Sequence, residues 1–322
     1  MRLSVPSIPL EILNTVGRAQ EISLKAAIER VVNFLTPGNT TVLTGAGVSV
    51  DSGIRAYRGN DGRQRYWSRA YMGYQPIHRA WPNPTHYALA ALMYTTFIKD
   101  IITQNVDGLH AKASSLSVEE EHPQILQLHG SLHNVHCQKY HFEPRARYQY
   151  RISVINPKWK QLADDLENSR IQLRTNPDGD IELPGIRFDD FQIPPCEMCL
   201  SEGVVETTMK PSVIFFGESI SNPARDDSFA RIEACDQLLV VGTTLATYSA
   251  FRLVKHALEL NKPVLLLNHG PTRADKLAGV DKIEMHSGQV LHAVAELLTA
   301  GIGDEEVDRM LSSGIVTPVP PE

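Results

Sequence analysis

The sequence has little excess charge, few cysteines and no long hydrophobic run. It contains 31 Lys and Arg against 37 Asp and Glu, a formal net charge of −6, so a general nucleic-acid-binding surface is not expected. Basic residues cluster at 145–151, but Tyr148 and Tyr150 alternate with them as in a half-exposed strand. No apolar run approaches membrane-spanning length, and no signal-peptide core is present. We therefore expect a soluble intracellular protein that binds neither nucleic acid nor membrane.

With 322 residues, 42% of them hydrophobic, the chain can form one large α/β domain and a smaller one. Apolar runs predict strands, and helical spacing of apolar residues predicts the helices that cover them. Strands that are continuously apolar are typical of a parallel sheet covered on both faces. The expected strands are 42–44, 98–103, 213–216, 237–241 and 263–267, and the expected helices include 23–35, 251–260 and 289–298.

Residues 130–209 have a different character, because they are polar, carry several tyrosines and include turn formers such as Asn176-Pro177-Asp178-Gly179-Asp180. This stretch is too long for a simple loop in a compact domain. We predict a Rossmann-like, doubly wound α/β fold with an inserted small domain. The large domain would comprise 20–130 and 210–300, the insert 131–209, and the terminal arms 1–19 and 301–322, which lack periodicity.

A glycine-rich turn follows the first expected strand: Thr44-Gly45-Ala46-Gly47-Val48-Ser49. Glycines let a backbone approach a pyrophosphate closely, and the free N–H groups of a following helix favour its charge. A dinucleotide is the natural ligand. The usual dehydrogenase pattern needs a third glycine where Val50 stands and an acidic residue about 20 positions on, where the chain has Arg63-Gln64-Arg65. The turn therefore predicts a Rossmann-like dinucleotide site that is not a standard hydride-transfer site, and Val50 disfavours a dehydrogenase.

Further motifs follow in order: Thr103-Gln104-Asn105-Val106-Asp107-Gly108-Leu109-His110, Gln127-Leu128-His129-Gly130, residues 210–218, Val241-Gly242-Thr243-Thr244 and Leu267-Asn268. Singly, each has an ordinary structural explanation, such as a tight turn or a helix cap. Together and in this order they resemble the sirtuin family of NAD-dependent protein deacylases over roughly residues 20–300. Pro82-Asn83-Pro84-Thr85-His86 and Gly270-Pro271-Thr272-Arg273 resemble the class II branch, of the mitochondrial sirtuin four type.

The resemblance implies a reaction in which NAD is consumed: the acyl group of a protein lysine passes to ADP-ribose and nicotinamide leaves. It implies that His129 is the general base on a ribose hydroxyl, a task suited to neutral imidazole. Asn105 and Asp107 would line the nicotinamide and ribose pocket. The implied cofactor-binding residues are Gly45, Ala46, Gly47, Ser49, Gly53, Ile54, Tyr57, Arg58, Gln104, Asn105, Asp107, Gly242, Thr243, Thr244, Asn268 and Gly270. The implied acyl-lysine peptide site is Val213, Ile214, Phe215, Phe216, Gly217 and Glu218, to which the peptide adds as a strand.

Cys196 and Cys199 form a thiolate pair of zinc-binding spacing, and in sirtuins a second pair completes a structural zinc site. Here the second pair is broken, because Tyr140 stands where the partner of Cys137 is expected. A Cys₃His site completed by His141 is one interpretation; a water-completed site and a metal-free domain are the others. Cys235 precedes an apolar strand and is expected to be a buried small hydrophobe.

Two departures from the family bear on activity. Arg55-Ala56 replaces a proline and a polar residue that sirtuins carry there, and the loop at 59–62 is shorter than the cofactor-binding loop of class II relatives. Because a lid often completes a catalytic site, the alternative to an active deacylase, with a possible ADP-ribosyltransferase activity, is a catalytically weak NAD- or ADP-ribose-binding regulator. We expect a monomer. The resemblance suggests the mitochondrial matrix, although Pro6 and Pro9 interrupt any helical transit peptide.

Overall fold

The computed structural model describes residue 8 and residues 22–48, 63–168, 190–205, 207–215 and 218–314. Within these ranges the chain forms two compact units. One contains residues 63–80 and 130–218, and the other contains residues 22–48, 81–129 and 219–314. Residues 63–80, which we expected in the large domain, thus belong to the unit that contains the predicted insert 131–209.

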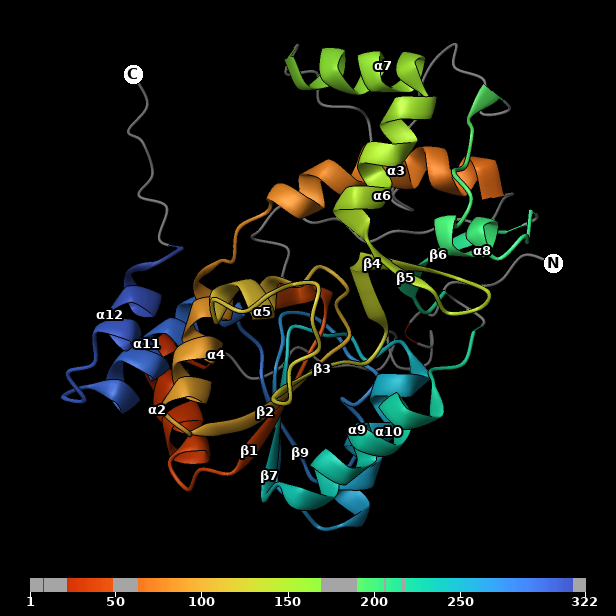
Figure 1. Ribbon diagram of the computed structural model, residues 1–322. Helices are drawn as coiled ribbons and strands as arrows, with labels where there is room; N and C mark the ends of the chain where they lie inside the picture. Colours follow the sequence, from red (N-terminus) through yellow and green to blue (C-terminus); the bar gives the residue numbers. More distant parts are fainter. Residues whose placement is uncertain are drawn as a thin grey trace. The chain divides into compact units, whose positions relative to one another are not determined.

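The larger unit is built on a six-stranded, fully parallel sheet of order β3-β2-β1-β7-β8-β9 (Figure 1). Its strands are β1 (Thr40–Thr44), β2 (Ile98–Thr103), β3 (Ile125–Gln127), β7 (Gln237–Val241), β8 (Val264–Leu267) and β9 (Val280–Ile283). Its helices are α2 (Leu24–Leu35), the short 3₁₀ turn η1 (Ala46–Val48), α4 (Pro84–Tyr94), α5 (Leu109–Ala113), α9 (Asn222–Ala234), α10 (Tyr248–Glu259), α11 (Ser287–Thr299) and α12 (Glu305–Ser312).

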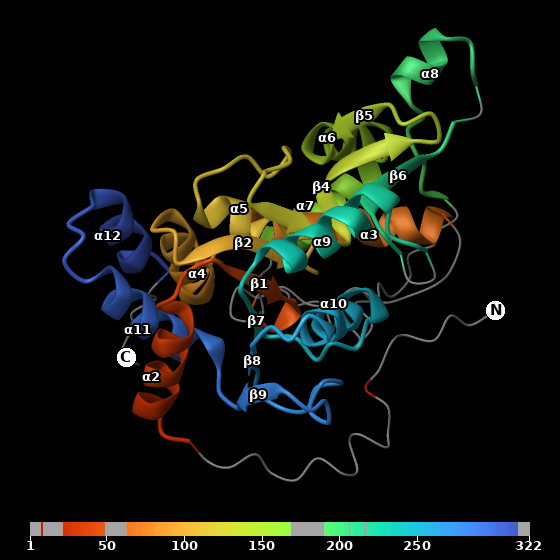
Figure 2. The same ribbon diagram turned by 90° about the horizontal axis from the view of Figure 1, so that it is seen from below.

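Alternate residues of the central strands point into two separate apolar cores. Val42 and Leu239 pack with α2, α4 and α11, whereas Leu43 and Leu238 pack with α9 and α10. Figures 1 and 2 show these two helical layers on opposite sides of the sheet. Every residue of β1, β7 and β8 is buried. The sheet is therefore covered on both faces, as the continuous apolar runs predicted.

The smaller unit contains the antiparallel sheet β5-β4-β6. Its elements are α3 (Arg63–Arg79), β4 (Gly130–Cys137), β5 (Phe142–Pro144), α6 (Arg145–Ile155), α7 (Pro157–Asn168), α8 (Glu197–Ser201) and β6 (Met209–Val213). Its core includes Trp67, Tyr148, Trp159 and Phe191. The Rossmann-like parallel sheet and the added small unit confirm the predicted fold class.

Two predicted strands are wrong. The apolar run 213–216 was expected in the parallel sheet, but the strand is β6, ends at Val213 and pairs antiparallel with β4. Residues 145–151 form α6 rather than a half-exposed strand. Burial there follows helical spacing, with Arg145, Tyr148 and Ile152 inward and Tyr150 70% exposed. The Arg145 guanidinium lies 4.9 Å from the ring centroid of Trp67, so this basic residue supports the core of the unit.

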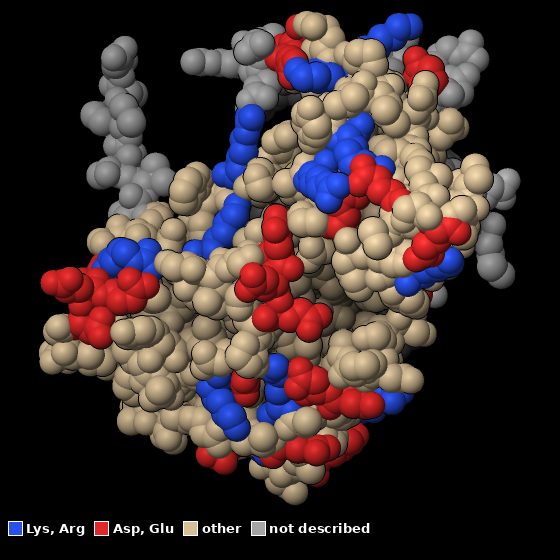
Figure 3. Space-filling model, in the orientation of Figure 1, with Lys and Arg blue, Asp and Glu red and all other residues tan. Residues whose placement is uncertain are grey.

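The predicted C-terminal arm 301–322 is wrong in part, because α12 lies within it. Val307 and Met310 are buried, and α12 packs with Tyr87 and Ala91 of α4. Acidic residues occupy its first turn, where the helix dipole favours them, and Figure 3 shows acidic side chains at this helix. Elsewhere on that face, a group of acidic side chains lies near the centre, and basic and acidic side chains adjoin one another around it. The arm at 1–19 lies outside the described residues except for Ile8.

In the described part of the chain, no helix is both long and apolar enough to cross a membrane.

Candidate active site

The glycine-rich turn lies at the carboxyl ends of β1 and β7, where the order of the sheet reverses. β1 is flanked by β2 on one side and β7 on the other, and crevices at such reversals are the usual ligand sites of open α/β sheets. The Gly45 N–H donates to the Val241 carbonyl at 3.3 Å, and the Gly47 N–H donates to the Gly242 carbonyl at 2.8 Å. The turn at 45–47 is therefore held against the end of β7.

Two glycines of this turn have no room for a side chain. A Cβ on Gly45 would lie 2.6 Å from the Cβ of Thr243, and a Cβ on Gly47 would lie 2.6 Å from the carbonyl oxygen of Gly242. Gly242 itself has φ +58, a conformation that favours glycine. The close approach of the two backbones thus requires glycine at these positions for packing alone, and their role at a phosphate stays a prediction.

Gln104 connects the glycine-rich turn after β1 to the segment that follows β7. Its side-chain Nε2 donates to the Thr44 carbonyl at 3.1 Å and to Thr243 Oγ1 at 3.0 Å, and its Oε1 accepts from Thr247 Oγ1 at 3.1 Å. Its backbone N–H also donates to the Thr44 carbonyl at 3.1 Å. These bonds fix both the side chain and the main chain of Gln104 at the carboxyl edge of the sheet.

Asn105 and Asp107 are both buried at the end of β2, with exposed fractions of 9% and 4%. Asn105 Nδ2 donates to the Gly45 carbonyl at 3.1 Å. Asp107 Oδ1 accepts from the backbone N–H of Leu109 at 3.0 Å, so this carboxylate bonds to the first N–H group of helix α5. The structure therefore brings the glycine turn, Gln104 and Asn105 together.

His129 follows β3 and lies on the same edge of the larger unit. Its Nδ1 is 3.1 Å from the Gln104 carbonyl oxygen, and its Nε2 is 2.7 Å from Ser249 Oγ. Burial lowers the pKa of His129 below its ordinary value, and the hydrogen bond to the Gln104 carbonyl opposes this only in part. The imidazole is therefore neutral near pH 7, the form that a general base requires.

Two further imidazoles, those of His86 and His110, pack against each other, and His110 contacts the last residue of β1. Their ring centroids are 4.9 Å apart, and His110 Nε2 lies 3.0 Å from Thr44 Oγ1. Asn83 accepts from the first N–H groups of α4 and donates from Nδ2 to the Val48 carbonyl at 2.7 Å. The start of α4 is thus tied to the glycine turn, although we predicted no role for His86 or His110.

Acid should destabilise the protein through this pair. Burial lowers the pKa of His110 to about 4, and burial together with the nearby His110 lowers the pKa of His86. The unfolded chain takes up protons below about pH 6.5 while the folded protein does not. The stabilisation from His110 is therefore complete above pH 6.5 and decreases by up to about 3 kcal/mol as the pH falls to 4. Urea unfolding between pH 7 and 4.5 should show this slope, and His110→Gln should reduce it; an unchanged slope would contradict the assignment.

The other predicted cofactor residues lie along the ends of β7 and β8. Thr243 and Asn268 are 6% exposed, and Thr244 is exposed. Asn268 Nδ2 donates to the carbonyls of His269 and Gly270, both at 3.1 Å. Of the remaining predicted cofactor residues, five fall outside the described ranges: Ser49, Gly53, Ile54, Tyr57 and Arg58. The departures at Arg55-Ala56 and 59–62 also fall outside them.

The predicted peptide segment continues from the end of β6. Val213 ends the strand, and the Phe215 ring packs edge-on against Tyr66 with centroids 5.0 Å apart. Glu218 accepts from the Phe215 N–H at 2.9 Å and from Lys210 Nζ at 2.5 Å. Ile214 is the residue between Val213 and Phe215 in the sequence. Phe216 and Gly217 are outside the described residues.

The small unit gathers Cys137, His141, Cys196 and Cys199 so that their ligand atoms all lie within 4.8 Å of one another. The sulfurs of Cys137 and Cys199 are 3.6 Å apart, and His141 Nδ1 is 3.6 Å from Cys196 Sγ and 3.4 Å from Cys199 Sγ. A tetrahedral zinc site separates two sulfurs by about 3.8 Å and a sulfur from a nitrogen by about 3.5 Å. The donor set therefore fits zinc through three thiolates and one imidazole.

The local backbone explains how histidine takes the fourth place. Tyr140 adopts φ +62 and is 71% exposed, so the turn that begins at Cys137 points this side chain outward. The next residue, His141, then faces the sulfurs with Nδ1, while its Nε2 lies 3.3 Å from Glu202 Oε1. A carboxylate on the distal nitrogen is the usual partner of a zinc-bound imidazole. Burial disfavours the Cys137 thiolate, but hydrogen bonds from the His141 N–H and the neighbouring thiols lower the pKa of Cys137 overall.

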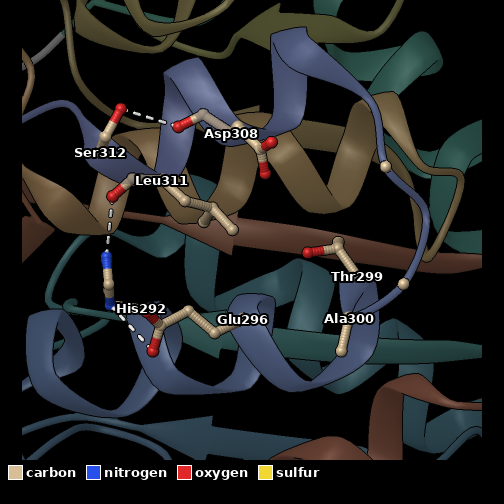
Figure 4. A pocket seen from close by; sticks show the side chains of 9 residues that line it. His292, Glu296, Thr299, Ala300, Asp308, Leu311 and Ser312 are labelled. Carbon is tan, nitrogen blue, oxygen red and sulfur yellow. Dashed lines mark hydrogen bonds and ion pairs between the residues drawn. The ribbon is translucent and has the colours of Figure 1, made fainter.

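A separate hollow lies between α11 and α12 (Figure 4). His292 Nε2 lies 2.9 Å from the Leu311 carbonyl oxygen there, and Glu296, Thr299 and Asp308 also line it. None of the predicted site residues lies in this hollow.

Sequence reasoning missed two contacts of the site, those of Ser249 and Thr247. Neither residue is part of a motif, and both lie at the beginning of α10, far along the chain from Gln104 and His129. A serine or threonine at a helix N-terminus is common for capping alone, so no local pattern indicates these contacts.

Comparison with known proteins agrees with this geometry. A family described as "Sir2 family" matches residues 63–249. "NAD-dependent protein deacylase SIR4" of Batrachochytrium dendrobatidis is 38% identical over 86% of this chain and 96% of its own length. "NAD-dependent protein deacylase SRT2" of Arabidopsis thaliana is 35% identical over 82% of this chain and 74% of its own.

Solved structures show the same fold. The structure described as "Structural Basis for the Mechanism and Regulation of Sir2 Enzymes" has a TM-score of 0.56 and 26% identity, covering 88% of this chain and 98% of the other. The complex described as "Sir2-p53 peptide-NAD+" has a TM-score of 0.58 at 22% identity, covering 84% and 98%, and supports the fold alone.

Proposed function

Because this chain belongs to the Sir2 family of sirtuins, we propose that it is an NAD-dependent protein-lysine deacylase, which transfers the acyl group to ADP-ribose and releases nicotinamide. The observation that carries the proposal is the position of the His129 imidazole at the carboxyl edge of the sheet, between the Gln104 carbonyl and Ser249. The imidazole lies on the same edge of the sheet as the glycine turn, and both contact Gln104, whose Nε2 donates to the Thr44 carbonyl and whose own carbonyl bonds to His129 Nδ1. Relatives whose names give this activity include those from Batrachochytrium and Arabidopsis.

NAD supplies the electrophilic C1′ of the nicotinamide ribose. The residues of this chain would bind and orient it: the backbone of 45–47 and Gly242 at the pyrophosphate, Asn268 at the adenosine ribose, and Asn105 at the nicotinamide end. His129 would take the proton of a ribose hydroxyl at Nε2, because Nδ1 is already bonded to the Gln104 carbonyl. Preorganised dipoles such as the Asn105 amide, held by Gly45, would stabilise developing charge with little reorganisation.

Finer features belong to the same proposal. We propose that the substrate is an acylated lysine of a protein, bound along residues 213–218, and that the protein acts as a monomer without nucleic acid or membrane. A class II, sirtuin four type assignment, a side activity as an ADP-ribosyltransferase and a location in the mitochondrial matrix rest on the sequence motifs. The fungal relative's name supports the first of these.

Nicotinamide release with a panel of acyl-lysine peptides tests the function directly. We expect release that depends on both NAD and the acyl group, and the panel should identify the preferred acyl chain. Calorimetry with NAD on the same preparation distinguishes the alternative. A chain that binds NAD but releases no nicotinamide with any peptide would be the catalytically weak regulator suggested by its short 59–62 loop.

Gly47→Ala should weaken NAD binding by about tenfold or more. The new Cβ would lie 2.6 Å from the Gly242 carbonyl oxygen, and because that oxygen is a backbone atom and cannot rotate away, the main chain of the turn has to move. The measurement is NAD affinity by calorimetry. Gly301→Ala is the control, since Gly301 has φ +85 but open space around it and lies outside the proposed site. It should cost about 1 kcal/mol of stability and leave the affinity unchanged. Equal loss in both variants would show that the effect is general destabilisation.

A further inference from the structure

Ser249 contacts the proposed base directly. It is the second residue of α10, and its Oγ lies 2.7 Å from His129 Nε2, the shorter of the two hydrogen bonds that the imidazole makes. The residues come from distant parts of the chain, so the contact depends on the fold and not on local turn geometry. Both belong to the larger unit.

The partners of His129 determine which nitrogen carries its proton. The Gln104 carbonyl 3.1 Å from Nδ1 can only accept a hydrogen bond, so Nδ1 carries the hydrogen. Nε2 of the neutral ring then has a lone pair, and Ser249 is the donor to it. The carbonyl that selects this tautomer is itself held, because the backbone N–H of Gln104 donates to Thr44 and its side chain bonds to Thr44, Thr243 and Thr247.

We infer that Ser249 is a positioning residue for His129: its hydroxyl orients the imidazole and occupies the lone pair of Nε2 until the substrate hydroxyl takes its place. The inference rests on the proposed deacylase function. In the proposed reaction the ribose hydroxyl would give its proton to Nε2, and the electron pair of its O–H bond would form the new C–O bond to the acyl carbon. That carbon is then part of the imidate formed when the acyl oxygen displaces nicotinamide, and the π electrons of its C=N bond would move to the nitrogen. Nδ1–H remains bonded to the Gln104 carbonyl, which stabilises the imidazolium.

This role differs from that of an ordinary helix-start serine. A capping serine stands at the N-cap and accepts from a backbone N–H of its own helix, as Ser23 and Ser221 do for α2 and α9. The N-cap of α10 is Thr247, so Ser249 lies one residue inside the helix start, and its hydroxyl bonds to His129. Loss of the Ser249 hydroxyl would leave Nδ1 bonded but free the ring to swing about that one contact. A small misplacement of a catalytic group lowers the rate strongly.

Ser249→Thr and Ser249→Val form a matched pair, because the two side chains have the same branched shape and differ in the hydroxyl. We expect Ser249→Thr to keep kcat within about threefold and Ser249→Val to lower it by about ten- to a hundredfold, with a smaller change in KM for NAD. ¹⁵N NMR of His129 is the second measurement. The Nε2 resonance should move in the Val variant and stay in place in the Thr variant, with Nδ1 protonated in both.

Equal losses in both variants would overturn the inference, because shape and not the hydroxyl would matter. Wild-type kcat or an unmoved Nε2 resonance in Ser249→Val would overturn it as well. The NMR measurement needs no turnover, so it separates this inference from the proposed function. An inactive wild-type chain whose Nε2 resonance still distinguishes Val from Thr would refute the deacylase and support the Ser249 contact.

Discussion

His129→Ala is expected to lower the rate of nicotinamide-coupled deacylation by a factor of about 10²–10⁴, the range typical of general bases. The variant removes the only imidazole that contacts the Gln104 carbonyl among the described residues. NAD affinity should change much less, because the contacts between the glycine turn, Gln104 and Thr243 do not involve His129. Single-turnover rates and calorimetry on the same preparations measure the two quantities separately.

His256→Ala is the matched control. His256 lies on α10 in the same unit, and its contacts are to the exposed side chains of Glu233 and Glu259 and to the Phe229 ring, with none to Gln104 or the glycine turn. Its replacement should leave the rate within about twofold, since such exposed contacts contribute little. If His129→Ala kept wild-type activity, another group would have to be the base.

The fold could be predicted where burial alone decides structure. The strands 98–103 and 237–241 match β2 and β7 at both ends, because their residues are buried between two helical layers, with only Lys99 exposed. Elements whose inward residues contact distant partners could not be predicted. Arg145 looks like a surface charge in the sequence, yet it is 1% exposed because the aromatic ring of Trp67 and the Ala70 carbonyl receive its guanidinium. The α12 helix could not be predicted for the same reason, since Val307 and Met310 are buried through their packing against the distant helix α4.

The site shows the same division. Gly45, Gly47, Asn105 and His129 could be found because each lies in a motif at the end of a strand, and parallel strands bring their carboxyl ends to one edge. Their catalytic and binding roles remain predictions. Ser249 could not be found, because it meets His129 through the packing of α10 and not through any spacing in the sequence.

The structure favours the Cys₃His interpretation of the metal site over a water-completed site or a metal-free domain. Loss of this metal is the second change for which we expect a large effect. We expect about one zinc per chain after dialysis, by elemental analysis. Cys196→Ala should lose the metal and unfold the small unit, because zinc contributes about 10–16 kcal/mol of apparent binding free energy in comparable sites. Of the three tryptophans in the chain, Trp67 and Trp159 are buried in that unit, so their fluorescence should shift to longer wavelength on unfolding.

Variants at the fourth ligand distinguish a Cys₃His site from a water-completed one. His141→Cys should keep the zinc, since a Cys₄ site is equally suitable, whereas His141→Ala should weaken binding by about tenfold or more. Cys235→Ala is the control: Cys235 is buried in the larger unit, contacts the Ile232 carbonyl and is not part of the cluster. It should retain one zinc. Full zinc content in His141→Ala would assign the fourth position to water, and a metal-free wild-type chain with buried tryptophans would exclude a structural zinc altogether. Because His141 Nδ1 already lies at zinc-ligand separation from two sulfurs while Nε2 faces Glu202, we expect the imidazole to be the ligand.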